Sequence, residues 1–447
     1  MKRIRDAITS IISFVKTLHP AKLAMLGYIS YILIGWLLLC IPFFQRGNGV
    51  GALDNLFTAT SAVSTTGLVT VSVSDSYSRL GQFVIVVLIQ LGGIGYMTFG
   101  SFVILSRKTE LSAERTEVGR TVFSLPESFR IDKFIRSVIL FTVIIETIGA
   151  IALYPIFRAS GASQPLWCAV FHSISAFCTA GFGLFNNSFE DYASNFWLNA
   201  VISILSYLGA VGFIVCVDFW RKARGKVKDV TLTSKIILWS TFWLTILGTF
   251  VIFLTEPSIQ KNPPEIRLMT SFFQAMTSMT PVGFNTIGLS ALSRAAMLAM
   301  MLLMVIGASP PGTGGGLKTT TFSAMVGVMR GALQGRQDVQ FWGKIVPLER
   351  VWTAVAGLGF YLTMIFIGVF VLELTEPFEF EQTVFEAISA IGTVGLSTGI
   401  TSSLTTLGKL TIIFLMFCGR LGPLTFGIAL FFKGSEKKDA SDNDLAV

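Results

Sequence analysis

The chain has 447 residues, of which 52% are hydrophobic and only 13% are charged. Water-soluble domains usually carry about 25% charged residues, so this composition excludes an ordinary soluble protein. The formal net charge of +8 comes from lysine and arginine gathered mainly in the tails and a few loops. It is mostly a signal of membrane topology, and it requires no nucleic-acid partner.

Eight apolar runs indicate helices that cross a membrane, because each is close to or above the roughly 20 residues needed to span the hydrocarbon. The basic residues fall mainly in both tails and in the loops near 107–136, 220–235 and 330–350. The positive-inside rule therefore predicts that these loops and both termini are cytoplasmic. In chain order, the runs are 23–44, 81–106, 134–157, 195–219, 235–256, 292–329, 351–372 and 406–432.

Each outward-facing connection contains a segment that is too apolar for a loop and too short to span the membrane. Four such segments align without gaps: the third residue is always Phe, the seventh Ser or Thr, the eighth small and the thirteenth Gly. A repeat of this kind predicts the architecture of the whole chain. The segments are NLFTATSAVSTTGL (55–68), AVFHSISAFCTAGF (169–182), SFFQAMTSMTPVGF (271–284) and TVFEAISAIGTVGL (383–396).

The predicted fold is therefore an all-α polytopic membrane protein. Four helix, pore-loop, helix repeats surround one pseudo-fourfold axis with a central pore. We expect cytoplasmic tails at residues 1–22 and 433–447. The four repeats are expected at 23–106, 134–219, 235–329 and 351–432.

The end of each short segment has the properties of an ion-selectivity filter. Irregular backbone at membrane depth is tolerated only where it is buried in protein or lines water. A half-helix that enters from outside points the negative end of its dipole inward, and a following glycine lets carbonyls face a bare cation. Close helix packing also uses glycine, but it does not require a broken helix in every copy. The predicted filter residues are Thr65, Thr66, Gly67, Thr179, Ala180, Gly181, Pro281, Val282, Gly283, Thr393, Val394 and Gly395.

The sixth run is interrupted by PPGTGGGLKTT (310–320). This stretch is not a phosphate-binding P-loop, because Leu317 separates the last glycine from the lysine. Without that pair, a preceding strand or carboxylates for magnesium, we expect no enzyme activity. Glycine and proline break a spanning helix, and the freed backbone is tolerated beside a pore. We predict an intramembrane gate within 307–321 that contains Gly312, Thr313, Gly314, Gly315, Gly316 and Lys318.

Together, the four repeats, the filter glycines, the segment GASPPGTGGGLKTTTF (307–322) and an arginine within the last helix resemble the Trk/Ktr/HKT superfamily of potassium transporters. The resemblance covers nearly the whole chain, and the number of spanning runs makes it most similar to the membrane subunit of the bacterial Ktr system. It implies channel-like potassium uptake across the bacterial plasma membrane. Gly67 stands where a sodium-favouring plant subclass has serine, which also implies potassium.

The resemblance also implies partners. Members of this type form homodimers bound to a cytoplasmic ring of regulatory subunits, so we expect the nucleotide on that partner and no covalent cofactor on this chain. Sodium is a candidate activator, and membrane lipids surround the protein. The alternative function is an alternating-access symporter that couples potassium to sodium or protons. Such carriers typically contain inverted repeats, whereas these four copies share one orientation.

Three ionisable residues lie within apolar runs, where an unpaired charge is costly. Arg420 matches the arginine that the family places below the filter, which implies a charge barrier that contacts the gate. Lys318 either holds the gate loop or extends to the cytoplasmic interface. For Glu146 we expect a structural partner on a neighbouring helix rather than an ion. Acidic residues in the outer segments either concentrate cations at the pore mouth or form a solvated surface.

Overall fold

The computed structural model describes residues 19–47, 49–95, 131–225, 227, 229–310 and 312–431. Most of both predicted tails, the end of the first predicted repeat and the basic loop near 107–136 lie outside the described residues. Within the described residues the protein is almost entirely helical, which confirms the predicted all-α fold.

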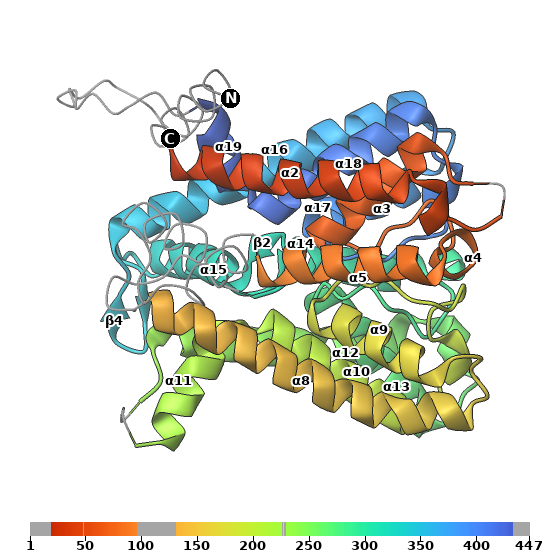
Figure 1. The fold of residues 1–447 in the computed structure, drawn as a ribbon. Helices are drawn as coiled ribbons and strands as arrows, with labels where there is room; N and C mark the ends of the chain where they lie inside the picture. The colour runs from red at the N-terminus through yellow and green to blue at the C-terminus, as the bar shows by residue number, and fades with distance from the viewer. Residues whose placement is uncertain are drawn as a thin grey trace.

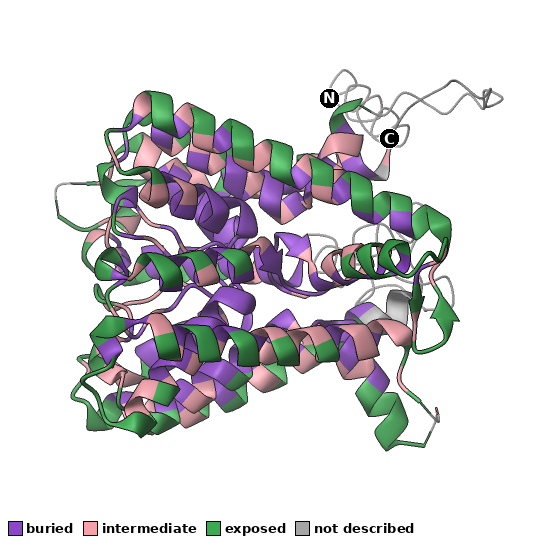
Figure 2. Ribbon diagram, turned by 180° about the vertical axis from the view of Figure 1, so that it is seen from behind, coloured by how far each residue is buried: buried purple, intermediate pink, exposed green. Residues whose placement is uncertain are grey.

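The first helix of each repeat is long and continuous. Within the described residues, four helices are long and apolar enough to cross a membrane. They lie at the periphery and expose large apolar side chains such as Trp243 and Phe366, which suits contact with lipid. Figure 2 shows the buried residues concentrated between them. These helices are α2 (Pro20–Leu39), α8 (Ile131–Ala159), α12 (Leu232–Thr255) and α16 (Leu348–Thr375).

The second helix breaks in more repeats than the sequence predicted. We expected an interruption only in the third repeat, where α14 (Arg294–Val305) is indeed separated from α15 (Thr319–Leu333). The runs 195–219 and 406–432, however, are not single helices. The chain bends by 94° between α10 (Phe196–Ala210) and α11 (Phe213–Ala223), and by 97° between α18 (Thr406–Leu421) and α19 (Pro423–Phe431). In the first repeat, α5 (Arg79–Ile94) ends at the same place in the motif.

In the first, second and fourth repeats, the second helix ends at two glycines that are three residues apart. The second glycine adopts a positive φ of 87° at Gly95, 90° at Gly212 and 84° at Gly422, which ends the helix. The first glycine lies three residues earlier, at Gly92, Gly209 and Gly419. It packs directly on a backbone carbonyl of the short aligned segment in the same repeat. The contacted carbonyls belong to the ninth residue of each aligned segment, Val63, Phe177 and Ile391.

The short segments form half-helices that lie inside the ring of longer ones. They are α3 (Ala52–Ser64), α9 (Pro165–Phe177), α13 (Pro264–Met279) and α17 (Phe380–Gly392). Short α4 (Val73–Ser76) and five 3-10 turns shape the outer loops: Pro42–Phe44, Glu190–Tyr192, Pro257–Ile259, Leu289–Ala291 and Thr401–Ser403. Two small strand pairs complete the fold, with β1 (Ile306–Gly307) parallel to β2 (Leu317–Lys318) and β3 (Gln340–Phe341) antiparallel to β4 (Lys344–Ile345).

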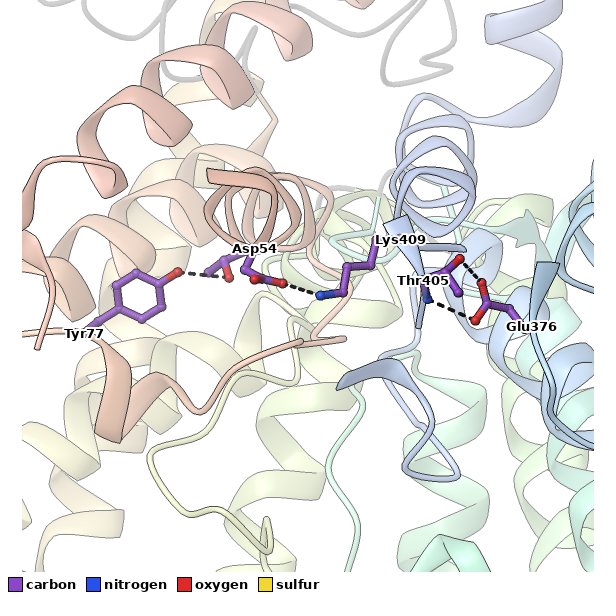
Figure 3. A network of polar contacts seen from close by, with 6 residues as sticks. Asp54, Tyr77, Glu376, Thr405 and Lys409 are labelled. Carbon is purple, nitrogen blue, oxygen red and sulfur yellow. Dashed lines mark hydrogen bonds and ion pairs between the residues drawn. The ribbon is translucent and has the colours of Figure 1, made fainter. Parts of the chain in front are cut away.

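The first and last repeats lie side by side, so the four repeats close into a ring (Figure 1). An ion pair joins them where Lys409 Nζ of α18 lies 2.7 Å from Asp54 Oδ1 of α3 (Figure 3). Glu376 accepts from the N–H of Thr405, the N-cap of α18, at 3.0 Å, and Glu256 accepts from the N–H of Ser293, the N-cap of α14, at 2.9 Å. These outer acids therefore hold helices together.

We predict that Lys409→Met lowers the thermal unfolding midpoint in detergent by roughly 3 °C, because it leaves Asp54 unpaired at a joint between repeats. The matched control is Arg294→Met. Its ion pair with Glu381 also joins two repeats, but the Arg294 side chain is 87% exposed, so its loss should cost less than about 1 °C. Equal shifts in the two variants would show that the Asp54–Lys409 pair does not stabilise the ring.

Candidate ion pathway

Each half-helix ends where the chain enters the predicted filter. Thr65, Thr179 and Thr393 have positive φ angles of 53°, 51° and 51°, which threonine rarely adopts. Each donates its N–H to a carbonyl in the last turn of its helix. In the third repeat Pro281 has no N–H to donate, and α13 is capped instead by Thr280 with a φ of −90°. Three repeats therefore share one entry geometry and the third differs.

The four predicted glycines meet in a closed ring. Their φ angles are all positive, at 97°, 66°, 82° and 90° for Gly67, Gly181, Gly283 and Gly395. A Cβ on Gly67 would lie 2.5 Å from the Ala180 carbonyl oxygen, and one on Gly181 would lie 2.7 Å from that of Val282. A Cβ on Gly283 would lie closer still to the Val394 carbonyl oxygen, and one on Gly395 closer still to that of Thr66. Each glycine thus faces the next repeat, and the last faces the first.

Backbone hydrogen bonds give the same support to all four filter segments. The N–H of the residue before each glycine donates to the carbonyl of the seventh residue in its segment, over 2.8 to 3.1 Å. In the first and fourth repeats the hydroxyl of that seventh residue also accepts from the glycine N–H, at 3.0 and 3.1 Å. This hydroxyl bond accounts for Ser61 and Ser389, whereas the hydroxyls of Ser175 and Thr277 are buried with no hydrogen-bond partner among the described residues.

A cavity of about 380 Å³ lies on the outer side of the ring. All four filter glycines line it, together with neutral polar side chains from the loops beyond them. Within the described residues no acidic side chain lines this vestibule, so its lining does not support the first of the two interpretations of the outer acids, the concentration of cations at the mouth. Asp75 lies one layer behind it, where Asn186 donates to its Oδ2 at 2.9 Å. Hydrogen bonds from Asn186 and then Ser72 hold the pKa of Asp75 below its ordinary value.

The predicted gate loop crosses the inner side of the ring. The β1–β2 pair closes the loop, whose residues contact the first filter residue of every repeat. Thr313 accepts from the Thr65 hydroxyl at 3.2 Å through its carbonyl, and its own hydroxyl lies 3.0 Å from that of Thr179. The Gly315 N–H donates to Thr393 Oγ1 at 2.8 Å, and Gly314 packs against Pro281. The loop therefore contacts the inner end of all four predicted filter segments.

The broken second helices hold the loop from the other side. Their last carbonyls are free, because the helix ends there. The N–H groups of Ser309 and Thr313 each donate at 3.1 Å, to Ala210 and Gly209 of α10. The Gly316 N–H donates to Gly419 of α18 at 3.3 Å. The glycine breaks therefore supply the acceptors that seat the loop.

Arg420 joins the loop to the first repeat. Its Nη1 donates to the Thr313 carbonyl and to Thr65 Oγ1, the latter at 3.0 Å. Its Nη2 donates to carbonyls in the last turn of α5, on Gly92 and, at 3.3 Å, on Gly93. A positive charge thus lies below the filter, bound to the loop.

The other two membrane charges are also partnered. Lys318 Nζ donates to the Gly314 carbonyl at 2.7 Å, so it holds the loop rather than reaching the interface. Glu146 accepts from Gln90 Nε2 of α5 at 3.0 Å, and Cys178 Sγ lies 3.7 Å from its other oxygen. Both contacts come from neighbouring elements, as the structural interpretation of Glu146 predicted.

Comparison with known proteins agrees with this geometry. The family model for TrkH, described as a cation transport protein, matches residues 33–439. The chain belongs to the TrkH family.

Among curated members, the chain is 36% identical to the potassium/sodium uptake protein NtpJ of Enterococcus hirae, over 94% of each chain. It is 34% identical to the Ktr system potassium uptake protein B of Bacillus subtilis, over 93% of this chain and 94% of that one. The crystal structure of TrkH from Vibrio parahaemolyticus has the same fold, with a TM-score of 0.71 at 18% identity, covering 91% of this chain and 84% of that one.

We predict that Gly395→Ala abolishes cation uptake, because the new methyl group would collide with the Thr66 carbonyl of the neighbouring repeat. Gly399→Ala is the matched control. Gly399 also has a positive φ, of 100°, and lines the vestibule, but no atom lies within 4 Å of its added methyl group. Rubidium uptake into cells should be lost in the first variant and retained in the second. Loss in both would assign the effect to backbone strain rather than to crowding of the ring.

Proposed function

We propose that this protein takes up potassium across the bacterial plasma membrane through a channel-like pore. The observation that carries the proposal is the closed ring of filter glycines, in which the preceding residues direct carbonyls at neighbouring repeats. Rings of backbone carbonyls replace the hydration shell of an alkali cation. Both curated relatives are named for potassium uptake, and the first-repeat filter residue is Gly67.

The half-helices add to this preference for cations. Four of them end at the ring with their carbonyl ends toward it, so their dipoles place partial negative charge around the axis. Because no charged side chain among the described residues lines the vestibule, selection between ions depends on the carbonyls of the ring. A cation thus passes from a vestibule lined by neutral polar and apolar side chains to a site that only partly dehydrated ions can occupy.

The loop at 308–316 is the gate in this proposal. In the described conformation it lies below all four filter segments, and Arg420 adds a positive charge there. A unit charge about 4 Å from a cation raises its energy by about 4 kcal/mol at an effective dielectric constant of 20. Conduction requires the loop to leave the axis, which breaks the contacts of Thr313 with Arg420 and Thr179. Its glycines permit that movement.

Regulation from the cytoplasm would act through α15, which continues directly from the gate loop. We place a nucleotide-binding subunit ring and the two termini on that side, and we propose a homodimer. Two relatives are named as proteins B and D of a Ktr system. Sodium is the candidate activator, and one relative is named for sodium as well as potassium.

The second candidate is an alternating-access symporter for potassium with sodium or protons. Broken helices occur in such carriers, and here α10, α14 and α18 all break near one level. Unitary currents in planar bilayers separate the two functions. Discrete currents far above carrier turnover support the pore, whereas measurable flux without them supports the symporter.

We predict that Gly67→Ser lowers the preference for potassium over sodium by about tenfold, which corresponds to about 1.4 kcal/mol of discrimination. The added Cβ would lie 2.5 Å from the Ala180 carbonyl oxygen, whereas one at Gly395 would lie closer to that of Thr66, so a smaller shift of the ring holds the serine and flux is reduced rather than abolished. The measurement is competitive rubidium and sodium flux in proteoliposomes, with rescue of a potassium-uptake-deficient bacterium at low potassium. Rescue by the unaltered chain should be stronger with a regulatory subunit. Unchanged selectivity in the variant would contradict the filter assignment.

We predict that deletion of residues 312–316 raises potassium flux and removes its regulation, because the loop no longer crosses the pore. Arg420→Leu, which removes the charge but keeps the loop, should raise flux to a smaller extent. Arg294→Met, at an exposed ion pair far from the loop contacts, serves as the charge-removal control and should leave flux unchanged. Flux at the original level in both gate variants would contradict the assignment of this loop as the gate.

A further inference from the structure

A second layer of polar side chains lies behind the filter. The fourth residue of each aligned segment, directly after the shared phenylalanine, is polar and fully buried. Three residues after each filter glycine comes a second position, which is threonine in three repeats. The first set is Thr58, His172, Gln274 and Glu386, and the second is Thr70, Leu184, Thr286 and Thr398.

In two repeats these positions bond to each other. The Leu184 N–H donates to His172 Nε2 at 3.2 Å, and Gln274 Nε2 donates to Thr286 Oγ1 at 3.3 Å. Each bond ties the outer end of a filter segment to its half-helix. In the first repeat Thr58 Oγ1 lies 3.2 Å from the hydroxyl oxygen of Tyr77, which donates to Asn55 Oδ1 at 2.9 Å (Figure 3 shows where Tyr77 lies). The second layer therefore fixes the outer filter in a repeat-specific way.

The fourth repeat breaks this pattern. Glu386 accepts from the Thr401 hydroxyl through Oε1, but its Oε2 is buried and has no partner among the described residues. The equivalent of Thr286 is Thr398, and its hydroxyl is also buried without a described partner. A buried carboxylate with a single donor is costly. Two unpaired oxygen atoms at positions that bond directly in the third repeat point to a bound species between them.

The vestibule gives access to this place. Thr401 and Ser397 line the vestibule, and Thr401 Oγ1 lies 2.9 Å from Ser397 Oγ. Thr401, which lines the vestibule, is in direct contact with the buried Glu386 carboxylate. All the available ligands are oxygen atoms, which suit hard cations, and one of them carries a negative charge.

We propose that Glu386, Thr398, Thr401 and Ser397 form an alkali-cation site that is separate from the filter and is filled from the outer vestibule. An ion there would bridge the half-helix of the fourth repeat to its outer filter segment, as a direct hydrogen bond does in the third. External cations would thereby brace the filter without passing through it. The site can be measured by binding alone, so it does not depend on the proposed transport function.

The test is the thermal unfolding midpoint of the full chain in detergent, titrated with sodium, potassium or choline chloride at constant ionic strength. A ligand that binds the folded state raises this midpoint. Sodium should raise it for the original chain relative to choline. Glu386→Gln, which keeps the shape, and Thr398→Val should each increase the sodium concentration needed for half the shift at least about tenfold. Thr70→Val, at the equivalent unpaired threonine of the first repeat, is the matched control and should leave the titration unchanged.

Three outcomes would overturn the site. A midpoint that responds equally to sodium and choline in the original chain means that Glu386 holds only a proton or water. A sodium response retained in Glu386→Gln places the ion elsewhere. A response to potassium alone that both variants retain belongs to the filter. If Glu386→Gln does not fold, Thr398→Val decides the question. A sodium shift in an original chain that carries no rubidium flux would count against the proposed function and leave the site standing.

Discussion

The structure depends on one constraint, the mutual approach of four filter segments. Each filter glycine faces a carbonyl of the next repeat so closely that a methyl group would collide with it. Any displacement of one repeat therefore disturbs its neighbours. The left-handed threonines, the serine and threonine supports and the Asp54–Lys409 joint between first and last repeats all serve to hold this ring. Because the ring is continuous, the four repeats act as one site.

The proposed gate depends on backbone carbonyls that need hydrogen-bond donors. A helix that ends inside a membrane exposes carbonyls that need donors. In this protein the broken ends of α5, α10 and α18 offer those carbonyls to Arg420 and to the N–H groups of the loop. The loop in turn contacts every filter segment. Helix breaks, loop and arginine thus form one hydrogen-bonded unit below the ring, and it can leave the axis only if many of these bonds are exchanged.

Much of this architecture could be predicted from the sequence, because it repeats. Four aligned segments with a shared glycine predicted which positions meet at the centre of the fold, and the glycine-rich interruption predicted the loop beneath them. The breaks at Gly212 and Gly422 could not be predicted, since paired glycines in a spanning helix equally indicate close packing. The sequence feature that accompanies these helix ends is the shared three-residue spacing of the pairs Gly92–Gly95, Gly209–Gly212 and Gly419–Gly422. The partners of Glu146 and the outer acids depend on contacts between distant segments, which local periodicity does not encode.

Anomalous diffraction from crystals grown in rubidium tests the central claim most directly. The account predicts a peak on the axis within the ring formed by Gly67, Gly181, Gly283 and Gly395, in contact with carbonyls from all four repeats. It predicts no continuous ion density through the loop at 308–316 below that peak. An empty ring, with rubidium bound between only two repeats or at the side of the protein, would contradict it.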